Sequence, residues 1–325
     1  MSENEKFRFG VMGAGSIAGK FVDAVRRVPG CEVTAIASRD AARASAFAQK
    51  HGIPSAYAGY ETMLQEERLD AVYIAARTNA HAELTRLCIA HSVPVLCEKA
   101  MFTSSSEARE ILTMAREKGI FCMEAMWSRF LPAVQEMKKR LDAGEIGKPL
   151  YAELVLGWKA PRHPGNRYFD PAEGGGAAYD LLVYCYELAD FFLGAPDAEM
   201  TATVGWDENG ADITDVVTLT WSGQQPTCCG KLSASLVDSW KERAVIVGTR
   251  GRLMMPKPHM AEGFTLRRGL FHRDAWRDSQ TVNGFVYEVA EVVRCVREGL
   301  PESPVVPHAL TIRCAEMFDM INARK

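Results

Sequence analysis

Apolar positions in the first part of the chain follow two spacings, short unbroken runs and a repeat of three to four residues. The unbroken runs predict buried strands at 7–13, 31–38, 70–76, 93–97 and 120–124. The repeat predicts helices between them, at 16–28, 40–52, 80–92 and 104–119. Strands that are apolar on both faces and alternate with helices are typical of a parallel sheet covered on both sides. We therefore predict a doubly wound α/β fold for this part.

The spacing changes after residue 124. Helical spacing marks 131–144, 177–194, 284–299 and 308–322. Strand-like segments, which alternate more strictly and are separated by tight turns, lie at 149–158, 199–206, 213–221, 227–238, 243–248 and 251–255. We predict two domains, residues 1–124 and residues 125–325, the second an α+β domain with a mixed or antiparallel sheet.

Composition narrows the class of protein. The 325 residues have a net charge of -3, so a nucleic acid partner is not expected. The nine cysteines are odd in number and form no CxxC pattern, which favours reduced thiols in a cytoplasmic protein. No histidine or cysteine set has zinc-ligand spacing, so we expect no metal. No apolar run reaches about 18 residues, so no membrane span is expected.

A glycine-rich turn follows the first strand. The segment Gly13-Ala14-Gly15-Ser16-Ile17-Ala18 has the GxGxxA pattern between a strand and a helix. Gly13 permits the tight turn, Gly15 lets the backbone approach a pyrophosphate, and Ala18 lets the helix lie close to the sheet. The N–H groups at the helix start, at Ser16 and Ile17, would face the phosphates. The motif predicts a dinucleotide site, the alternative being a plain structural turn.

The end of the second strand bears on which dinucleotide binds. NAD-selective sites usually have an acidic residue here, whereas this chain has Ser38 and Arg39, with Arg43 one turn into the next helix. A guanidinium pairs with a 2′-phosphate that a carboxylate would repel. We therefore predict NADP as the preferred cofactor, with NAD possible if both arginines are only solvated and Asp40 reaches the ribose.

Charged and polar residues also stand where apolar segments end. Glu98 and Lys99 follow the fourth strand, at the edge where doubly wound sheets bind ligands. Three glycines, 174–176, precede a helix that carries Asp180 and, four residues on, Tyr184. Lysine, aspartate and tyrosine suit proton transfer at a carbinol carbon. The alternatives are a solvated Lys99 with Glu98 in an ion pair, Asp180 as a helix cap and Tyr184 as a core residue.

Five segments together resemble the glucose–fructose oxidoreductase/inositol dehydrogenase/rhizopine catabolism (Gfo/Idh/MocA) family. They are GAGSIA, VLCEKA, MEAMWSRFLP, RYFDPAEGGGA and DLLVY. The resemblance covers essentially the whole chain and is strongest to the branch of dimeric dihydrodiol dehydrogenase and NADP-dependent D-xylose dehydrogenase. It implies a Rossmann domain followed by a domain with a large open sheet.

The resemblance also implies roles for individual residues. It makes Lys99, Asp180 and Tyr184 catalytic. It assigns the NADP phosphate to Arg39 and Arg43 and a cofactor-side position to His81. Trp127, Arg129 and Phe130 fall in a stretch that borders the active-site cleft of relatives.

Three departures from the family pattern stand out. Lys99 is followed by Ala100 where relatives have proline, often after a cis bond, so the isomer here is open. Ala76-Arg77 replaces a Thr-Pro pair before His81, which bears on the nicotinamide edge. Leu182 replaces a common glycine, which predicts a tighter substrate pocket.

The expected reaction is hydride transfer between a nicotinamide and a CH–OH carbon of a sugar, polyol or trans-diol. Lys99 or Tyr184 would take the hydroxyl proton. Trp127, Trp158, Arg129 and Arg167 are candidate substrate contacts. A solvated loop explains Arg167 equally well, and tryptophans are more often core residues. A non-catalytic NADP-sensing protein on the same fold is the alternative function. An open sheet face predicts a homodimer or homotetramer.

Overall fold

The chain divides into two compact units in the computed structural model, which describes all residues except 1–4, 164, 197–199, 224 and 270–271. Unit 1 is Met1–Trp127 with Val282–Ile312, and unit 2 is Ser128–Thr281 with Arg313–Lys325. The predicted boundary after residue 124 lies three residues before the chain first leaves unit 1. Residues 282–312, which we had placed in the second domain, lie in unit 1 in this division, because their helix packs against the first helix of the chain.

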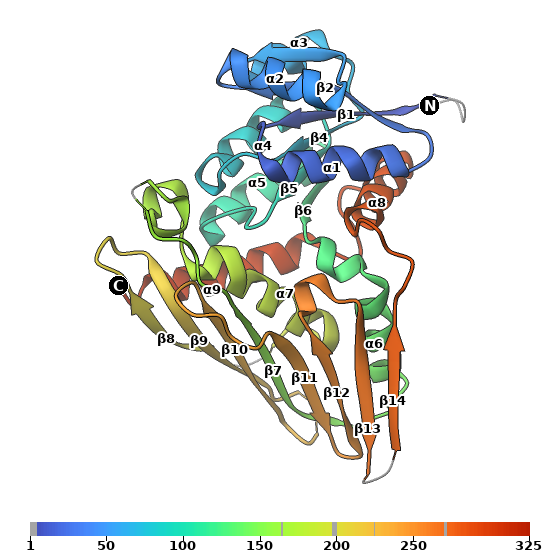
Figure 1. Ribbon diagram of the computed structural model, residues 1–325, viewed down its shortest axis with the longest axis vertical. Helices are drawn as coiled ribbons and strands as arrows, with labels where there is room; N and C mark the ends of the chain where they lie inside the picture. The colour runs from blue at the N-terminus through green and yellow to red at the C-terminus, as the bar shows by residue number, and fades with distance from the viewer. Residues whose placement is uncertain (1–4, 164, 197–199, 224, 270–271) are drawn as a thin grey trace. The chain divides into compact units, whose positions relative to one another are not determined.

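Unit 1 contains a six-stranded sheet in which every strand pair is parallel (Figure 1). Its strands are β1 (Phe7–Met12), β2 (Cys31–Ser38), β3 (Ser55–Ala58), β4 (Ala71–Ile74), β5 (Val95–Glu98) and β6 (Cys122–Ala125). The order β3-β2-β1-β4-β5-β6 reverses direction beside β1, which confirms the doubly wound fold. Strand β3 was not predicted from the sequence. Its four residues alternate between half-buried and exposed, so they form no buried apolar run.

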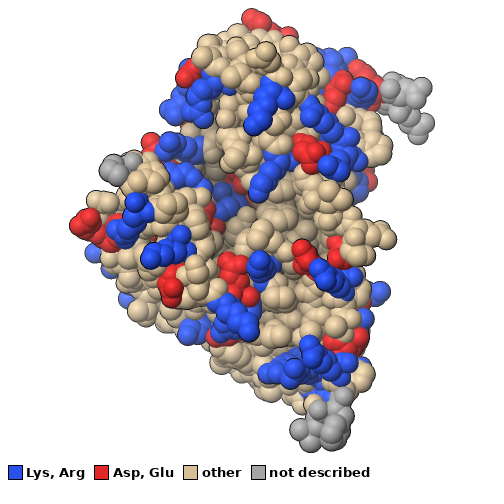
Figure 2. All heavy atoms as spheres, in the orientation of Figure 1, with Lys and Arg blue, Asp and Glu red and all other residues tan. Residues whose placement is uncertain are grey.

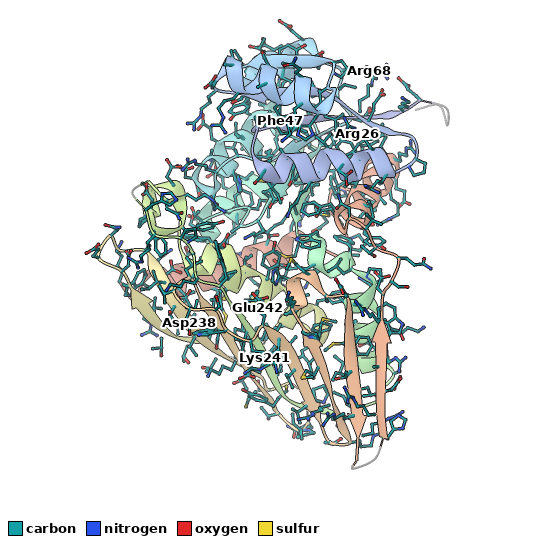
Figure 3. The ribbon with its side chains drawn as sticks, in the orientation of Figure 1. Arg26, Phe47, Arg68, Asp238, Lys241 and Glu242 are labelled. Carbon is teal, nitrogen blue, oxygen red and sulfur yellow. The ribbon has the colours of Figure 1, made fainter. Side chains whose placement is uncertain are left out.

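Among the described residues, six α-helices lie wholly within unit 1. They are α1 (Ser16–Arg27), α2 (Ala41–His51), α3 (Tyr60–Glu66), α4 (His81–Ala90), α5 (Ser105–Glu117) and α8 (Phe285–Arg297). Phe21 of α1 stacks on Tyr73 of β4 with ring centroids 3.8 Å apart, and both are fully buried. Arg26, labelled in Figure 3, donates to the carbonyl of His51 and ties α1 to the end of α2. The core of unit 1 therefore lies between the sheet and its helices.

Unit 2 is built on an eight-stranded sheet in the order β14-β13-β12-β11-β7-β10-β9-β8. Its strands are β7 (Pro149–Gly157), β8 (Thr201–Trp206), β9 (Asp212–Trp221), β10 (Cys228–Ser235), β11 (Arg243–Gly248), β12 (Gly251–Pro256), β13 (Gly263–Arg268) and β14 (His272–Arg277). Only the pair of β7 and β10 is parallel, so the sheet is mixed, as predicted. Residue 199, where we began one predicted strand, lies outside the described residues.

Strands β13 and β14 were not predicted either. Each carries two arginines, and these polar positions hide the strand alternation when hydrophobicity alone is considered.

One face of this second sheet is buried under helices. α6 (Pro132–Asp142) packs on β13, and α7 (Val183–Leu193) packs on β7 and β10 (Figure 1). The side chains under them, such as Leu154, Ile246 and Leu253, have no exposed surface. The opposite face presents alternate residues, among them Tyr151 and Met254, each 37% exposed.

The last helix, α9 (His308–Asn322), begins in unit 1 and ends in unit 2. Figure 2 shows Lys and Arg side chains interspersed with Asp and Glu over the face in view. Among the described helices, none combines the length and the apolar character that a membrane span needs.

Candidate active site

The glycine turn after β1 has the geometry that a bound phosphate requires. Gly13 has φ +106°, and a Cβ there would lie 2.6 Å from the carbonyl oxygen of Ala75, so only glycine fits. A Cβ on Gly15 would meet no atom within 4 Å, which leaves room beside the backbone. α1 starts without a side-chain cap or an acidic residue in its first turn. Its first N–H groups, including those of Ser16 and Ile17, therefore suit a pyrophosphate.

The residues after β2 leave two guanidinium groups exposed. Asp40 accepts hydrogen bonds from the N–H groups of Ala42 and Arg43, at 2.8 and 3.2 Å, and so caps α2. Moving Asp40 to a ribose would cost this cap, about 1 kcal/mol. Ser38 is buried and accepts from the Asp40 N–H, while Arg39 and Arg43 are exposed. The arrangement fits a 2′-phosphate.

Lys99 directly follows β5, at the carboxyl edge of the sheet. Glu98 accepts a hydrogen bond from the Tyr73 hydroxyl and another from the Lys99 N–H at 3.2 Å. The Lys99–Ala100 peptide bond is cis. The His81 ring is buried, with Nδ1 2.9 Å from the Ala100 carbonyl oxygen and Nε2 3.2 Å from that of Ala76. His81 thus links the loops that follow β4 and β5.

Helix α8 brings a buried acid to the same region of unit 1. Its Phe285 stacks on Trp127 with ring centroids 5.1 Å apart. Glu288, one turn further on, is fully buried, and neither carboxyl oxygen has a hydrogen-bond partner among the described residues. Burial first, and the charge of Glu98 second, raise the pKa of Glu288 well above its usual range. The sequence analysis missed this residue, because 190 positions separate it from Glu98.

In unit 2, a chain of contacts joins three of the predicted residues through one that was not predicted. The ring of Trp158 meets Tyr168 edge to face, with centroids 5.1 Å apart. The Arg167 guanidinium lies 4.1 Å from the Tyr168 ring centroid, and one of its nitrogens is 3.7 Å from Asp180. Tyr168 itself lies next to Arg167 in the predicted loop, a neighbour that the analysis could have considered.

Tyr184 lies in the first turn of α7, after a π-helical turn, η5 (Ala178–Leu182), that carries Asp180. Such turns recur at functional sites. The Tyr184 ring centroid is 5.4 Å from that of His259, and His259 Nδ1 is 3.9 Å from a carboxyl oxygen of Glu242, labelled in Figure 3. Burial raises the pKa of Glu242. The sequence shows no link between His259 and Tyr184, which only the fold brings together.

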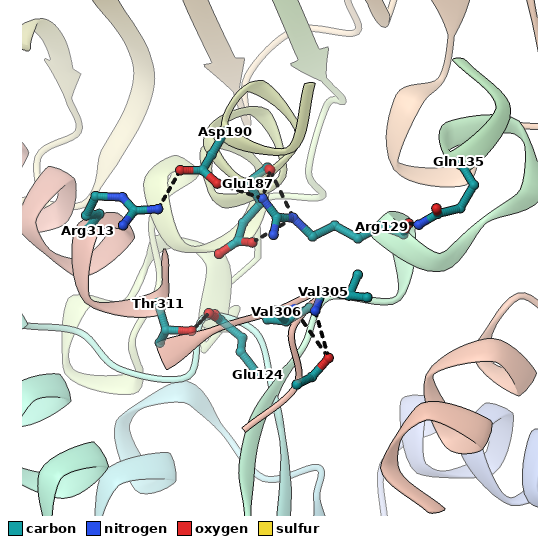
Figure 4. A network of polar contacts seen from close by, with 10 residues as sticks. Glu124, Arg129, Gln135, Glu187, Asp190, Val305, Val306, Thr311 and Arg313 are labelled. Atoms are coloured by element: carbon teal, nitrogen blue, oxygen red, sulfur yellow. Dashed lines mark hydrogen bonds and ion pairs between the residues drawn. The ribbon is translucent and has the colours of Figure 1, made fainter. Parts of the chain in front are cut away.

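Arg129, a predicted substrate contact, is 2% exposed and takes part in a buried ion-pair network (Figure 4). Its guanidinium donates to the Glu187 carbonyl oxygen at 2.7 and 3.1 Å and to the Asp190 carboxylate at 3.0 Å. Arg313 donates to the other carboxyl oxygen of Asp190 at 2.6 Å. The network joins the turn before α6 to α7 and to the part of α9 that lies in unit 2.

The predicted site residues therefore form two sets, each in its own unit. Unit 1 holds the cofactor residues together with Lys99 and Trp127, and unit 2 holds Trp158, Arg167, Asp180, Tyr184 and the buried Arg129.

The chain is similar to known proteins over nearly its full length. Residues 7–126 match a family model described as an oxidoreductase family with an NAD-binding Rossmann fold, and residues 134–254 match the GFO/IDH/MocA C-terminal domain. Trans-1,2-dihydrobenzene-1,2-diol dehydrogenase of Mus musculus is 35% identical, over 98% of this chain and 96% of that one. The Homo sapiens protein of the same name is 32% identical, over 97% and 95%.

The chain is also similar to solved structures over nearly its full length. A 3-ketoreductase from Actinomadura kijaniata, crystallised with NADP and TDP-benzene, is 26% identical with a TM-score of 0.87 and 98% coverage of both chains. An aldose-aldose oxidoreductase from Caulobacter crescentus, 16% identical with a TM-score of 0.87 over 98% and 97% of the two chains, shares the fold.

Proposed function

Because this chain belongs to the Gfo/Idh/MocA oxidoreductase family, we propose that it transfers a hydride between NADP and a CH–OH carbon of a sugar, polyol or trans-diol. The family, the fold and the class of NAD(P)-dependent oxidoreductase, all predicted from the sequence, are confirmed. The observation that carries the proposal is the position of Lys99, directly after β5 in the unit that also holds the glycine turn. The carboxyl ends of parallel strands are where doubly wound sheets bind ligands.

The cofactor proposal rests on the glycine turn and the two arginines. The N-terminus of α1 and the open space beside Gly15 would hold the pyrophosphate, and Arg39 and Arg43 would pair with the 2′-phosphate. When bound, the nicotinamide supplies the hydride chemistry.

Lys99, Asp180 and Tyr184 are the proposed proton-handling groups. The ammonium of Lys99 and the phenol of Tyr184 can each exchange a proton with a substrate hydroxyl or carbonyl oxygen. Asp180, with Arg167 at 3.7 Å, would orient that oxygen. Trp127, Trp158 and Arg167 are proposed to contact the substrate. We assign Arg129 only a supporting role, since the buried network holds its guanidinium.

NADPH fluorescence during a screen of sugars, inositols and trans-diols tests the function. Turnover that falls at least about a hundredfold in Lys99→Met and in Tyr184→Phe, with NADPH binding unchanged, would support these roles. The variant with the larger loss in kcat identifies the main proton donor. Tight NADPH binding without turnover of any compound would instead support a sensor of NADP.

The same proposal includes assembly through the open face of the second sheet. Val245 and Val247 of β11 lie on this face with Tyr151 and Met254, around an ion pair of Arg243 with Glu153 at 2.6 Å. An exposed apolar surface of this kind favours a second copy. Met254→Glu should then lower the mass measured by sedimentation to that of a monomer, whereas Arg252→Glu on the same strand should have a smaller effect.

We also propose a cytoplasmic location, because none of the nine cysteines, all of which are among the described residues, is in a disulfide. Fractionation of cells that express a tagged chain would test it.

A further inference from the structure

Two aspartates of β9 lie on the same face of the second sheet although three positions separate them. In a regular strand, residues three apart point to opposite faces. On β8, Val204 pairs with Asp215 and Gly205 with Thr214. The next residue, Trp206, pairs with Asp212, so Ile213 is skipped and has no partner on β8. This β-bulge returns Asp212 to the face of Asp215. Both side chains are buried, with 3% and 0% exposure.

Asp212 holds the start of the helix that carries Asp180. Its carboxylate accepts a hydrogen bond from the Ala178 N–H at 2.6 Å. The backbone of Gly176, at φ +136°, comes so close that a Cβ there would collide with Asp212 Oδ1. Glycine at position 176 therefore admits a carboxylate of the protein itself, and no side chain within the helix caps its first turn.

No hydrogen-bond donor among the described residues reaches the carboxyl group of Asp215. Its side-chain contact is with Asp212. Two carboxylates in contact without a cation cannot both be ionised in a buried site. Burial first, and Asp212 second, raise the pKa of Asp215 to about 9.

The surrounding elements add little charge to this pair. The titratable groups on the helical elements packed here are Tyr179 and Asp180 of η5 and, on α7, Tyr184, Cys185, Tyr186, Glu187 and Asp190. None of them contributes to the shift of the Asp215 pKa. β8 has none, and Lys231 of β10 lies on the opposite face of the sheet from Asp215. The shift of the Asp215 pKa is due to burial and to Asp212 alone.

We propose that Asp212 and Asp215 share one proton and that this buried pair is the positioning element for Asp180 and Tyr184. Asp215 donates a hydrogen bond to Asp212. Asp212 in turn accepts from the Ala178 N–H and so fixes the first turn of the helix that carries Asp180 and Tyr184. Loss of the proton places two charges side by side and loosens this turn. The inference rests on the proposed function, because it concerns the same two residues.

The pH dependence of kcat tests the pair on the intact protein. Wild type should lose turnover above a pH of about 9, whereas Asp215→Asn, whose amide donates without ionising, should stay within about threefold of wild type at pH 7 and lose this alkaline decline. Asp207→Asn is the matched control, because Asp207 is a buried acid of the adjoining turn whose oxygen accepts from two backbone N–H groups. It should leave the decline unchanged.

Hydrogen exchange of the backbone amides at 177–184 gives a second readout that needs no substrate. After correction for intrinsic rates, wild type should lose protection between pH 7 and pH 10, and Asp215→Asn should keep it. If the exchange results are as expected but no compound is turned over, the proposed function is refuted and the structural role of the aspartate pair is supported. If turnover is normal but neither the decline nor the exchange depends on Asp215, the role of the pair is refuted.

Discussion

The two units differ in the kind of group from which their candidate sites are made. In unit 1, the cofactor site consists mainly of backbone: the turn at Gly13, the space at Gly15 and the N–H groups at the start of α1. In unit 2, side chains from distant segments make the site, and buried carboxylates hold them. A backbone site needs only a short contiguous motif, whereas a side-chain site depends on the packing of the whole unit.

The largest effect is expected from the buried network of unit 2. Arg129→Leu should lower the free energy of unfolding by about 3–5 kcal/mol, because Glu187 loses the guanidinium beside its buried charge and Asp190 keeps only Arg313. Denaturant titration followed by tryptophan fluorescence measures it. The exposed Arg43→Leu in unit 1 is the control and should change stability by less than about 0.5 kcal/mol. Equal losses in both variants would remove the contrast between the units.

Glu288 tests whether unit 1 also depends on a buried acid. Its folded-state pKa is raised, so the folded state keeps a proton that the unfolded state releases. The contribution of Glu288 to the free energy of unfolding is therefore fully present below the ordinary pKa of glutamate, about 4.3. Above that pH the free energy of unfolding falls by up to about 1.4 kcal/mol per pH unit. Glu288→Gln should flatten this fall between pH 5 and pH 8 in thermal unfolding. A variant with the slope of wild type would show that Glu288 is already ionised in the fold.

Cofactor selection should depend on exposed charge. The double change Arg39→Ala and Arg43→Ala removes two possible charge-assisted contacts to a 2′-phosphate, about 2–3 kcal/mol together. The KM for NADP should rise about 30- to 100-fold, with the KM for NAD nearly constant. Added salt should weaken NADP binding to wild type and have less effect on the variant. A parallel rise for both cofactors would argue against phosphate recognition.

The smallest effect is expected from alanine substitutions at the two glycines of the turn, which should differ in their consequences. Gly15→Ala places a methyl group in open space, so stability should hold while NADP affinity falls about tenfold, or 1.4 kcal/mol. Gly13→Ala should lower both, because its backbone has φ +106° and its Cβ would strike Ala75. Calorimetry and thermal unfolding of the two variants give both quantities. Unchanged affinity in Gly15→Ala would exclude the turn as the pyrophosphate site.

The sequence predicted the parts of the molecule that depend on local patterns. The alternation of strands and helices, the glycine turn and the position of Lys99 are all encoded within a few neighbouring residues. Contacts between segments far apart in the sequence could not be predicted. Glu288 beside Glu98, His259 beside Tyr184 and the return of Asp212 by a bulge depend on register and packing, which hydrophobic spacing does not contain. For the same reason Arg129 was predicted to contact substrate, although its side chain is buried in an ion-pair network.

Unit 1 is completed by a segment that is synthesised after almost all of unit 2. Helix α8 packs on α1 and contributes the fully buried Val289 and Val292. At typical translation rates of about 5–20 residues per second, the ribosome needs on the order of ten seconds or more to pass from residue 127 to the end of this segment. During that time the nascent unit 1 lacks the helix that packs on α1. A fragment that ends at residue 127 should therefore aggregate or bind chaperones, and adding the α8 segment in trans should reduce this.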